Sequence, residues 1–116
     1  MAGLTTHVLD TSNGKPAKNM RIDLFFEEST LIKINSFITN KDGRVSNSLL
    51  SNKELNSGVY ELHFYVGKYF DFMKTKLPKI KFLDIVKIRF GIHNIDDHYH
   101  VPLLVSPYGY STYRGS

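Results

Sequence analysis

The stretch HYHVPLLV, residues 98–105, alternates in side-chain character in the way that is typical of a β-strand. Residues two positions apart in a strand lie on the same face. One face of this predicted strand is apolar and holds Tyr99, Val101 and Leu103. The other face places imidazoles beside apolar groups and holds His98, His100, Pro102 and Leu104. The first face therefore predicts contact with a core, and the second lies outside it.

The same period of two recurs along the chain, in segments that turn residues separate. The predicted strands are Leu4–Leu9, Arg21–Glu27, Leu31–Thr39, Val59–Val66, Ile85–Ile92, His98–Val105 and Tyr110–Tyr113. Only Lys68–Lys74 favours a helix, of about two turns. Short strands at this spacing predict an all-β fold, an antiparallel β-sandwich.

Length and composition place the chain among small globular proteins. Its 116 residues are enough for one domain, residues 1–116, and 41% of them are hydrophobic. It contains no cysteine, which excludes a cysteine nucleophile and a thiolate metal site. The first ten residues do not show the basic stretch and apolar run of a signal peptide. No apolar run approaches the roughly 20 residues of a membrane span. We therefore expect a soluble, cytoplasmic protein.

The net charge of +4 raises the question of an acidic partner. Much of the excess comes from one segment, with Lys74, Lys76, Lys79, Lys81 and Lys87. These lysines alternate with apolar residues such as Leu77 and Ile80, which is typical of the solvated side of a half-buried segment. There is no arginine-glycine repeat and no recognition-helix pattern, so we expect neither nucleic acid nor membrane as a partner.

A second histidine-bearing strand has the same organisation. In Leu4–Leu9, His7 shares a face with Thr5 and lies opposite the apolar side. Histidines among apolar groups on an outer face indicate a partner surface or a ligand site. A His-x-His pair with His7 as a third ligand could also bind a metal ion. The residues alone leave these alternatives open.

Single residues have plainer interpretations as well. A lone histidine on a strand is more often a hydrogen-bonded structural residue, and this interpretation suits His63 and His93. Arg44, after Asp42-Gly43, would usually be a solvated turn residue, and Tyr113–Ser116 would usually be disordered. The residues by themselves predict a β-sandwich with histidines on one outer sheet.

Three motifs together resemble a known family. They are LTTHVLDTSNGKPA at Leu4–Ala17, DGR at Asp42–Arg44, and HYHVPLLVSPYGYSTYRGS at His98–Ser116. They resemble the 5-hydroxyisourate hydrolases, the transthyretin-related enzymes of urate degradation. The resemblance implies a transthyretin-like sandwich of two four-stranded sheets with one short helix. It also implies a homotetramer in which the outer sheets of two dimers face each other across a channel that holds the active sites.

The resemblance also implies which residues form the site. The catalytic positions fall on His7, Arg44 and His100. The substrate-binding positions fall on His98, Tyr113, Arg114, Gly115 and Ser116. His7, His100 and Tyr113 are then expected to point out of the sandwich. The segment between Gly67 and Phe82 is longer and more basic than the family pattern, which affects the helix boundaries and not the site.

The chemistry expected from the resemblance is hydrolysis of a cyclic amide-like bond in a planar, oxidised purine. A neutral imidazole is a suitable base near pH 7, and arginine can stabilise the charge that develops on a carbonyl oxygen. Either His7 or His100 could be that base, with Arg44 holding the substrate. No cofactor and no metal are expected. The alternatives are a transthyretin-like carrier of small aromatic ligands, which would not need the two histidine motifs, and a bare interaction module.

Overall fold

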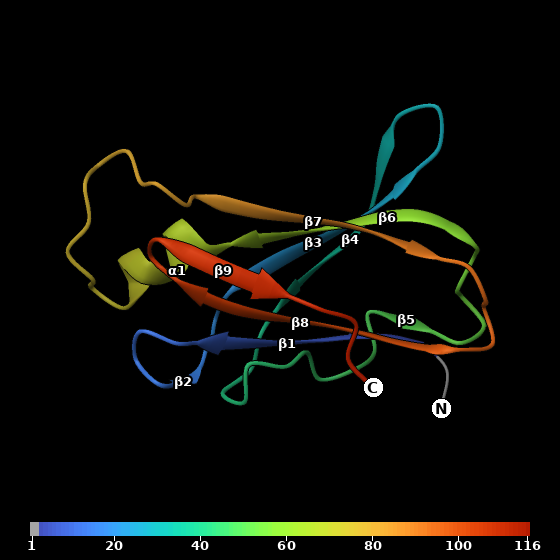
Figure 1. Ribbon diagram of the computed structural model, residues 1–116, viewed down its shortest axis with the longest axis horizontal. Coiled ribbons are helices and arrows are strands. Elements are labelled where there is room, and N and C mark those ends of the chain that lie inside the picture. Colours follow the sequence, from blue (N-terminus) through green and yellow to red (C-terminus); the bar gives the residue numbers. More distant parts are fainter. Residues whose placement is uncertain (1–2) are drawn as a thin grey trace.

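The computed structural model describes residues 3–116 as two β-sheets packed face to face, with one helix at an end of the sandwich (Figure 1). The strands are β1 (Gly3–Asp10), β2 (Lys15–Pro16), β3 (Arg21–Glu27), β4 (Leu31–Ile38), β5 (Leu50–Ser51), β6 (Gly58–Tyr65), β7 (Ile85–Ile92), β8 (His98–Ser106) and β9 (Gly109–Thr112). The helix, α1, spans Val66–Phe72. The transthyretin-like, all-β sandwich is confirmed.

The predicted boundaries agree with the structure in two strands and differ in the helix. β3 and β7 have the predicted limits, whereas α1 begins two residues earlier than predicted. It does so because Val66, Tyr69 and Phe70 form one helical face and are all buried. It ends before Lys74, whose φ of 59° is left-handed. The lysines that follow are exposed, as expected, except Lys81, which is partly buried and pairs with Asp71 at 3.1 Å.

The sheet topology departs from the expectation in two ways. One sheet has the order β2-β1-β8-β9, with the short β5 also paired to β1, and therefore counts five strands where four were expected. The other sheet has the order β4-β3-β6-β7. The long central pair β1–β8 is parallel, whereas the other described pairs are antiparallel. This parallel pair aligns Thr5 with His100, so it determines which side chains of the two histidine-bearing strands meet.

The faces of the two histidine-bearing strands are as predicted. Leu4 and Val8 of β1 and Leu103 of β8 are fully buried against Leu24, Leu62 and other residues of the second sheet. Each such side chain stabilises the fold by about 1.5–3 kcal/mol relative to an exposed one. On the outer face, Thr5, His7, His98, His100 and Leu104 are half-buried, and Pro102 is buried. The histidines therefore lie outside the core, on a face that is only partly open to solvent.

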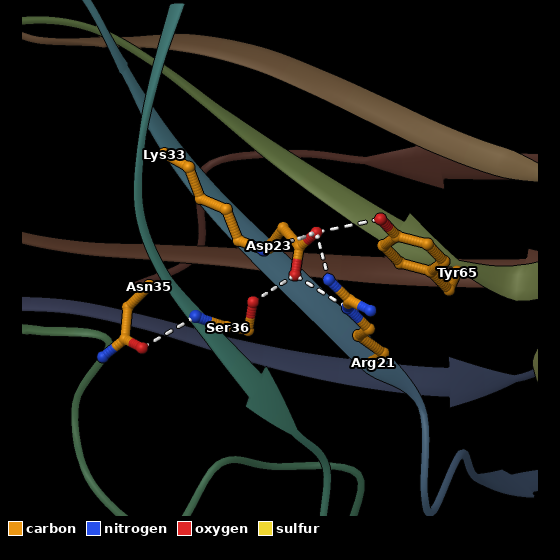
Figure 2. Close-up of polar contacts among 6 residues, drawn as sticks. All are labelled: Arg21, Asp23, Lys33, Asn35, Ser36 and Tyr65. Carbon is orange, nitrogen blue, oxygen red and sulfur yellow. Dashed lines mark hydrogen bonds and ion pairs between the residues drawn. The ribbon is translucent and has the colours of Figure 1, made fainter.

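The outer face of the other sheet carries a polar network around Asp23 (Figure 2). The carboxylate accepts hydrogen bonds from Arg21 Nε at 3.0 Å, Ser36 Oγ at 2.6 Å and the Tyr65 hydroxyl at 2.9 Å, and Lys33 Nζ lies 3.6 Å away. Burial alone raises the pKa of Asp23, but these hydrogen bonds outweigh it and lower the pKa to about 2. This carboxylate is therefore ionised and fully partnered.

Within residues 3–116, no helix is both long enough and apolar enough to cross a lipid bilayer.

Candidate active site

A tight turn places Arg44 beside His7. Val8 N donates to Gly43 O at 2.8 Å, and His7 and Arg44 pair as an isolated antiparallel bridge. Gly43 has a φ of 72°, and a Cβ there would lie 2.3 Å from Val8 O. Only glycine allows this close approach of the two backbones. The Asn40 side chain holds the turn by accepting hydrogen bonds from Asp42 N at 2.9 Å and Arg44 N at 3.2 Å.

The parallel pair brings His98 and His100 to the same face as His7. Their rings are nearly parallel, at 11°, with centroids 6.4 Å apart. The Thr5 hydroxyl lies between them, with its Oγ1 2.8 Å from His100 Nδ1 and 3.3 Å from His98 Nε2. Two strands that are distant in sequence thus supply the imidazoles of one cluster, and a threonine of β1 connects two of them.

The electrostatics of the cluster favour neutral imidazoles. Burial lowers the pKa of His7 below 6.5 and the Arg44 charge adds to this, against a backbone hydrogen bond and the carboxylate of Asp42, which raise it. The pKa of His100 is lowered by burial first, then by Arg44, and then by His98 and His7. Arg44 makes no ion pair with any residue in the range 3–116. The site therefore holds a guanidinium without an ion pair among residues 3–116, beside His7 and His100, whose lowered pKa favours the neutral imidazole.

Gly115 is in contact with the cluster. Gly115 N donates to His100 O at 2.7 Å, and a Cβ at residue 115 would lie 2.6 Å from His100 Cδ2. The His100 ring thus packs directly on this glycine, with no room for a side chain. Ser116 follows and is exposed.

Tyr113 and Arg114 are not part of the imidazole cluster, although Arg114 donates to the backbone carbonyl of His98 at 3.4 Å. β9 ends at Thr112, so strand alternation does not continue to Tyr113. The Thr112 hydroxyl donates to Pro102 O at 2.7 Å. Tyr113 and Arg114 instead line a cavity of about 230 Å³ at the side of the sandwich, together with core-face and β7 residues that include Tyr99, Val101, Ile88 and Phe90. The Arg114 guanidinium lies 4.2 Å from the Tyr99 ring centroid. The structure therefore does not bring Tyr113 together with His7 and His100, contrary to expectation.

The histidines are not arranged as a metal site. No group of three or more His, Asp or Glu side chains in the described part of the chain could hold a metal ion. The three-histidine site that residue spacing left open is therefore not formed. The residues that are brought together, His7, His98, His100, Arg44 and Gly115, can transfer a proton and stabilise an oxyanion.

Sequence reasoning missed Thr5 as part of the site. The signal was present, because Thr5 lies two residues before His7 on the same face. Its contact with His98 and His100 depends on the parallel register of β1 and β8, and alternation within each strand does not reveal that register.

Comparisons with known proteins agree with this architecture. The sequence profile of the HIUase/Transthyretin family matches residues 4–115. 5-Hydroxyisourate hydrolase 2 of Rhizobium meliloti is 53% identical over 114 residues, which cover 97% of this chain and 95% of that protein. The structure of 5-hydroxyisourate hydrolase from Klebsiella pneumoniae has a TM-score of 0.82 and 34% identity, with all of both chains covered.

A further solved structure is similar over a part of its length. The crystal structure of (S)-allantoin synthase has a TM-score of 0.92 and 49% identity, over 99% of this chain and 44% of that one. The sandwich, the placement of the histidine-bearing strands and the match along nearly the whole sequence lead to one assignment: the chain belongs to the HIUase/Transthyretin family.

Proposed function

We propose that this protein hydrolyses 5-hydroxyisourate. The observation that carries the proposal is the cluster itself, in which two imidazoles with lowered pKa lie beside an arginine that has no ion-pair partner among residues 3–116. Such groups at a half-buried surface are typical of a catalytic site. The 53% identity to a protein named 5-hydroxyisourate hydrolase 2 supports the choice of substrate.

The proposed reaction begins with the attack of water on a ring carbonyl. One imidazole of the pair His7 and His100 accepts a proton from the water as its oxygen bonds to the carbonyl carbon. Arg44 stabilises the negative charge that develops on the carbonyl oxygen. The carbon–nitrogen bond then breaks, and the departing ring nitrogen takes up the proton that the imidazole holds. A positioned proton transfer of this kind contributes about 10²–10⁴-fold to the rate.

The remaining site residues are proposed as substrate contacts. His98 and Gly115 are supported by their contacts with the His100 side of the cluster. Tyr113, Arg114 and Ser116 are proposed from the resemblance and from their exposure. The Arg114 side chain is 57% exposed and has a long ion pair with Asp97, at 3.6 Å. It also lies over the Tyr99 ring and donates to His98 O at 3.4 Å. Replacing Arg114 with Gln should raise KM more than it lowers kcat.

We further propose that four copies assemble with their histidine-bearing faces across a shared channel. The half-buried Leu9 and Leu104 on this face support the proposal, since a monomer would leave them in contact with water. Light scattering at micromolar concentration tests it, and a stable monomer would contradict it.

The activity assay is direct. Uricase generates hydroxyisourate from urate, and its disappearance is followed by ultraviolet absorbance with and without the protein. Acceleration over spontaneous decay supports the proposed function, and its absence at micromolar protein overturns it. If the protein bound a substrate-sized aromatic compound without turnover, the transthyretin-like carrier would be the better description. The matched control is His63→Gln, on the outer face of the other sheet, which should leave turnover unchanged.

A further inference from the structure

The Thr5 hydroxyl is placed to decide which nitrogen of His100 carries the proton. Its Oγ1 is within hydrogen-bond distance of His100 Nδ1, at 2.8 Å, and lies 3.3 Å from His98 Nε2. A hydroxyl donates one hydrogen and accepts others, so it can donate to only one of these two rings. The direction of the hydrogen-bond chain therefore determines the tautomer of both histidines.

His98 supplies the observation that sets this direction. Its Nδ1 is buried and has no hydrogen-bond partner within residues 3–116. A proton on Nδ1 would be a buried N–H donor without an acceptor, which is rarer and more costly than an unused lone pair. The form of His98 that avoids this cost carries its proton on Nε2 and donates it to Thr5 Oγ1. The Thr5 hydrogen is then directed to His100 Nδ1, the closer of the two contacts.

We propose that Thr5 is a positioning residue that holds His100 as its Nε2–H tautomer, through a hydrogen-bond chain from His98 Nε2 to Thr5 Oγ1 to His100 Nδ1. This inference rests on the proposed function and deepens it. Nε2 is the ring nitrogen that does not face Thr5, so it is the one free to meet the substrate. In this tautomer it offers a hydrogen and not a lone pair.

The tautomer divides the roles that the proposed function left open. His100 donates a hydrogen bond from Nε2 to the developing oxyanion, alongside Arg44, and keeps its proton throughout. His7 is not part of this hydrogen-bond chain and has instead a backbone hydrogen bond at Asp42 through one ring nitrogen. Its other ring nitrogen accepts the proton of the attacking water. As the carbon–nitrogen bond breaks, His7 returns this proton to the departing nitrogen, so that protons balance and both imidazoles end neutral.

The tautomer can be measured without any turnover. Nitrogen-15 NMR of the histidine-labelled protein distinguishes a protonated from an unprotonated ring nitrogen at each histidine. The expected spectrum shows His100 protonated at Nε2 and not at Nδ1, and His98 likewise. Thr5→Ser retains the hydroxyl and should retain this pattern, whereas Thr5→Val removes it and should give mixed tautomers at His100. Wild-type protein with His100 protonated at Nδ1 would overturn the inference, whatever its activity.

Kinetics provide the second measurement. Thr5→Val should lower kcat by about tenfold, the worth of one net hydrogen bond, with KM nearly unchanged, and Thr5→Ser should restore it. The matched control is Thr6→Val, since Thr6 lies next in β1 and its hydroxyl donates to Val101 O in the interior, at 2.7 Å. This control should lose stability and keep kcat. Wild-type kcat in Thr5→Val would overturn the inference, whereas an inactive wild type with the expected tautomer would overturn only the proposed function.

Discussion

The outer faces of the two sheets each carry a polar cluster, and the two clusters are organised in opposite ways. On the β4-β3-β6-β7 sheet, Asp23 is surrounded by Arg21, Ser36 and Tyr65, and each of these donates to its carboxylate (Figure 2). On the outer face of the β2-β1-β8-β9 sheet, and within the described residues, His98 Nδ1 is buried without a hydrogen-bond partner and Arg44 lacks an ion pair. One cluster is fully partnered and the other is not.

This difference separates a stabilising network from a site. A buried carboxylate with its hydrogen bonds made contributes to the free energy of unfolding. A free guanidinium beside imidazoles raises the cost of protonating them and contributes nothing comparable to stability. Unpartnered polar groups of this kind are retained where a ligand completes them, and activity often opposes stability at such places. Variants of the two clusters should therefore affect different measurements.

The largest effect is expected from the histidines. His7→Asn and His100→Asn should each lower kcat/KM by about 10²–10⁴-fold, because each removes a proton-transfer group or an oxyanion donor. Both side chains lie outside the core, so thermal unfolding should be almost unchanged. His63→Asn, on the outer face of the other sheet, is the control and should keep its activity. Unfolded variants would show that the outer face of β1 and β8 is structural and would remove the contrast.

Asp23→Asn should show the reverse pattern, with lost stability and retained turnover. A pKa of about 2 in the folded protein, against 3.8 unfolded, corresponds to about 2 kcal/mol of stability. Because the folded pKa is the lower one, this contribution is present above about pH 4 and is lost as the pH falls toward 2. Urea unfolding should therefore separate wild type from the variant at pH 7 and much less at pH 2.5. A variant that unfolds like wild type at pH 7 would contradict the role of this network.

Gly115→Ala tests whether activity depends on the position of the His100 ring. The added Cβ would lie 2.6 Å from His100 Cδ2, so the ring must move. A displaced catalytic group should lower kcat/KM by about tenfold, while the free energy of unfolding changes little. Gly109→Ala is the matched control in the same sheet, because its nearest neighbour would be Ser106 Oγ at 3.8 Å. Equal activity of the two variants would show that the His100 ring position is not critical.

The pH profile tests the electrostatics of the site. Burial and the Arg44 charge lower the pKa of both His7 and His100 below 6.5, so the neutral forms persist at pH 6.5. The acid limb of kcat/KM should therefore have its midpoint below pH 6.5. Since the folded pKa is also below the unfolded one, protonation of these histidines should destabilise the protein as the pH falls below 6.5. Arg44→Gln should move the midpoint upward, and an unmoved midpoint would contradict the coupling to Arg44.

The smallest effect is expected from Lys33→Ala. Lys33 is 44% exposed and its Nζ lies 3.6 Å from Asp23, a long ion pair that water screens. Its loss should reduce the free energy of unfolding by less than about 0.5 kcal/mol and leave turnover unchanged. Calorimetry of this variant beside Asp23→Asn measures how much of the network is hydrogen bonding rather than charge alone. A large loss would assign more of the stability to charge.

The strands could be predicted from the sequence because burial imposes alternation directly on residue order. The faces of Leu4–Leu9 and His98–Val105, and hence the outward position of His7 and His100, followed from this period of two. The start of the helix at Val66 could not be predicted from the sequence, since it depends on the tertiary burial of Tyr69 and Phe70.

The assembly of the site could be predicted less well from the sequence. Alternation within a strand carries no information about its neighbour, so neither the parallel pair nor the contact of Thr5 with His100 was predicted. Arg44 beside His7 followed only from the resemblance, because it requires the backbone approach that Gly43 allows. The predicted last strand, Tyr110–Tyr113, ran one residue too far, because β9 ends at Thr112.

The parallel pairing of β1 and β8 has a consequence for how the protein reaches its active form. Thr5 and His100 are 95 positions apart in the sequence, so their contact closes a loop that contains most of the chain. Such non-local pairings are slow to form, because the entropy of closing the loop is lost before the contacts compensate for it. During synthesis, β1 is made early, and it cannot pair with β8 until the intervening residues have also been made. Recovery of turnover after dilution from denaturant therefore requires the closure of this pair, and we expect it to lag behind formation of the β3–β4 hairpin.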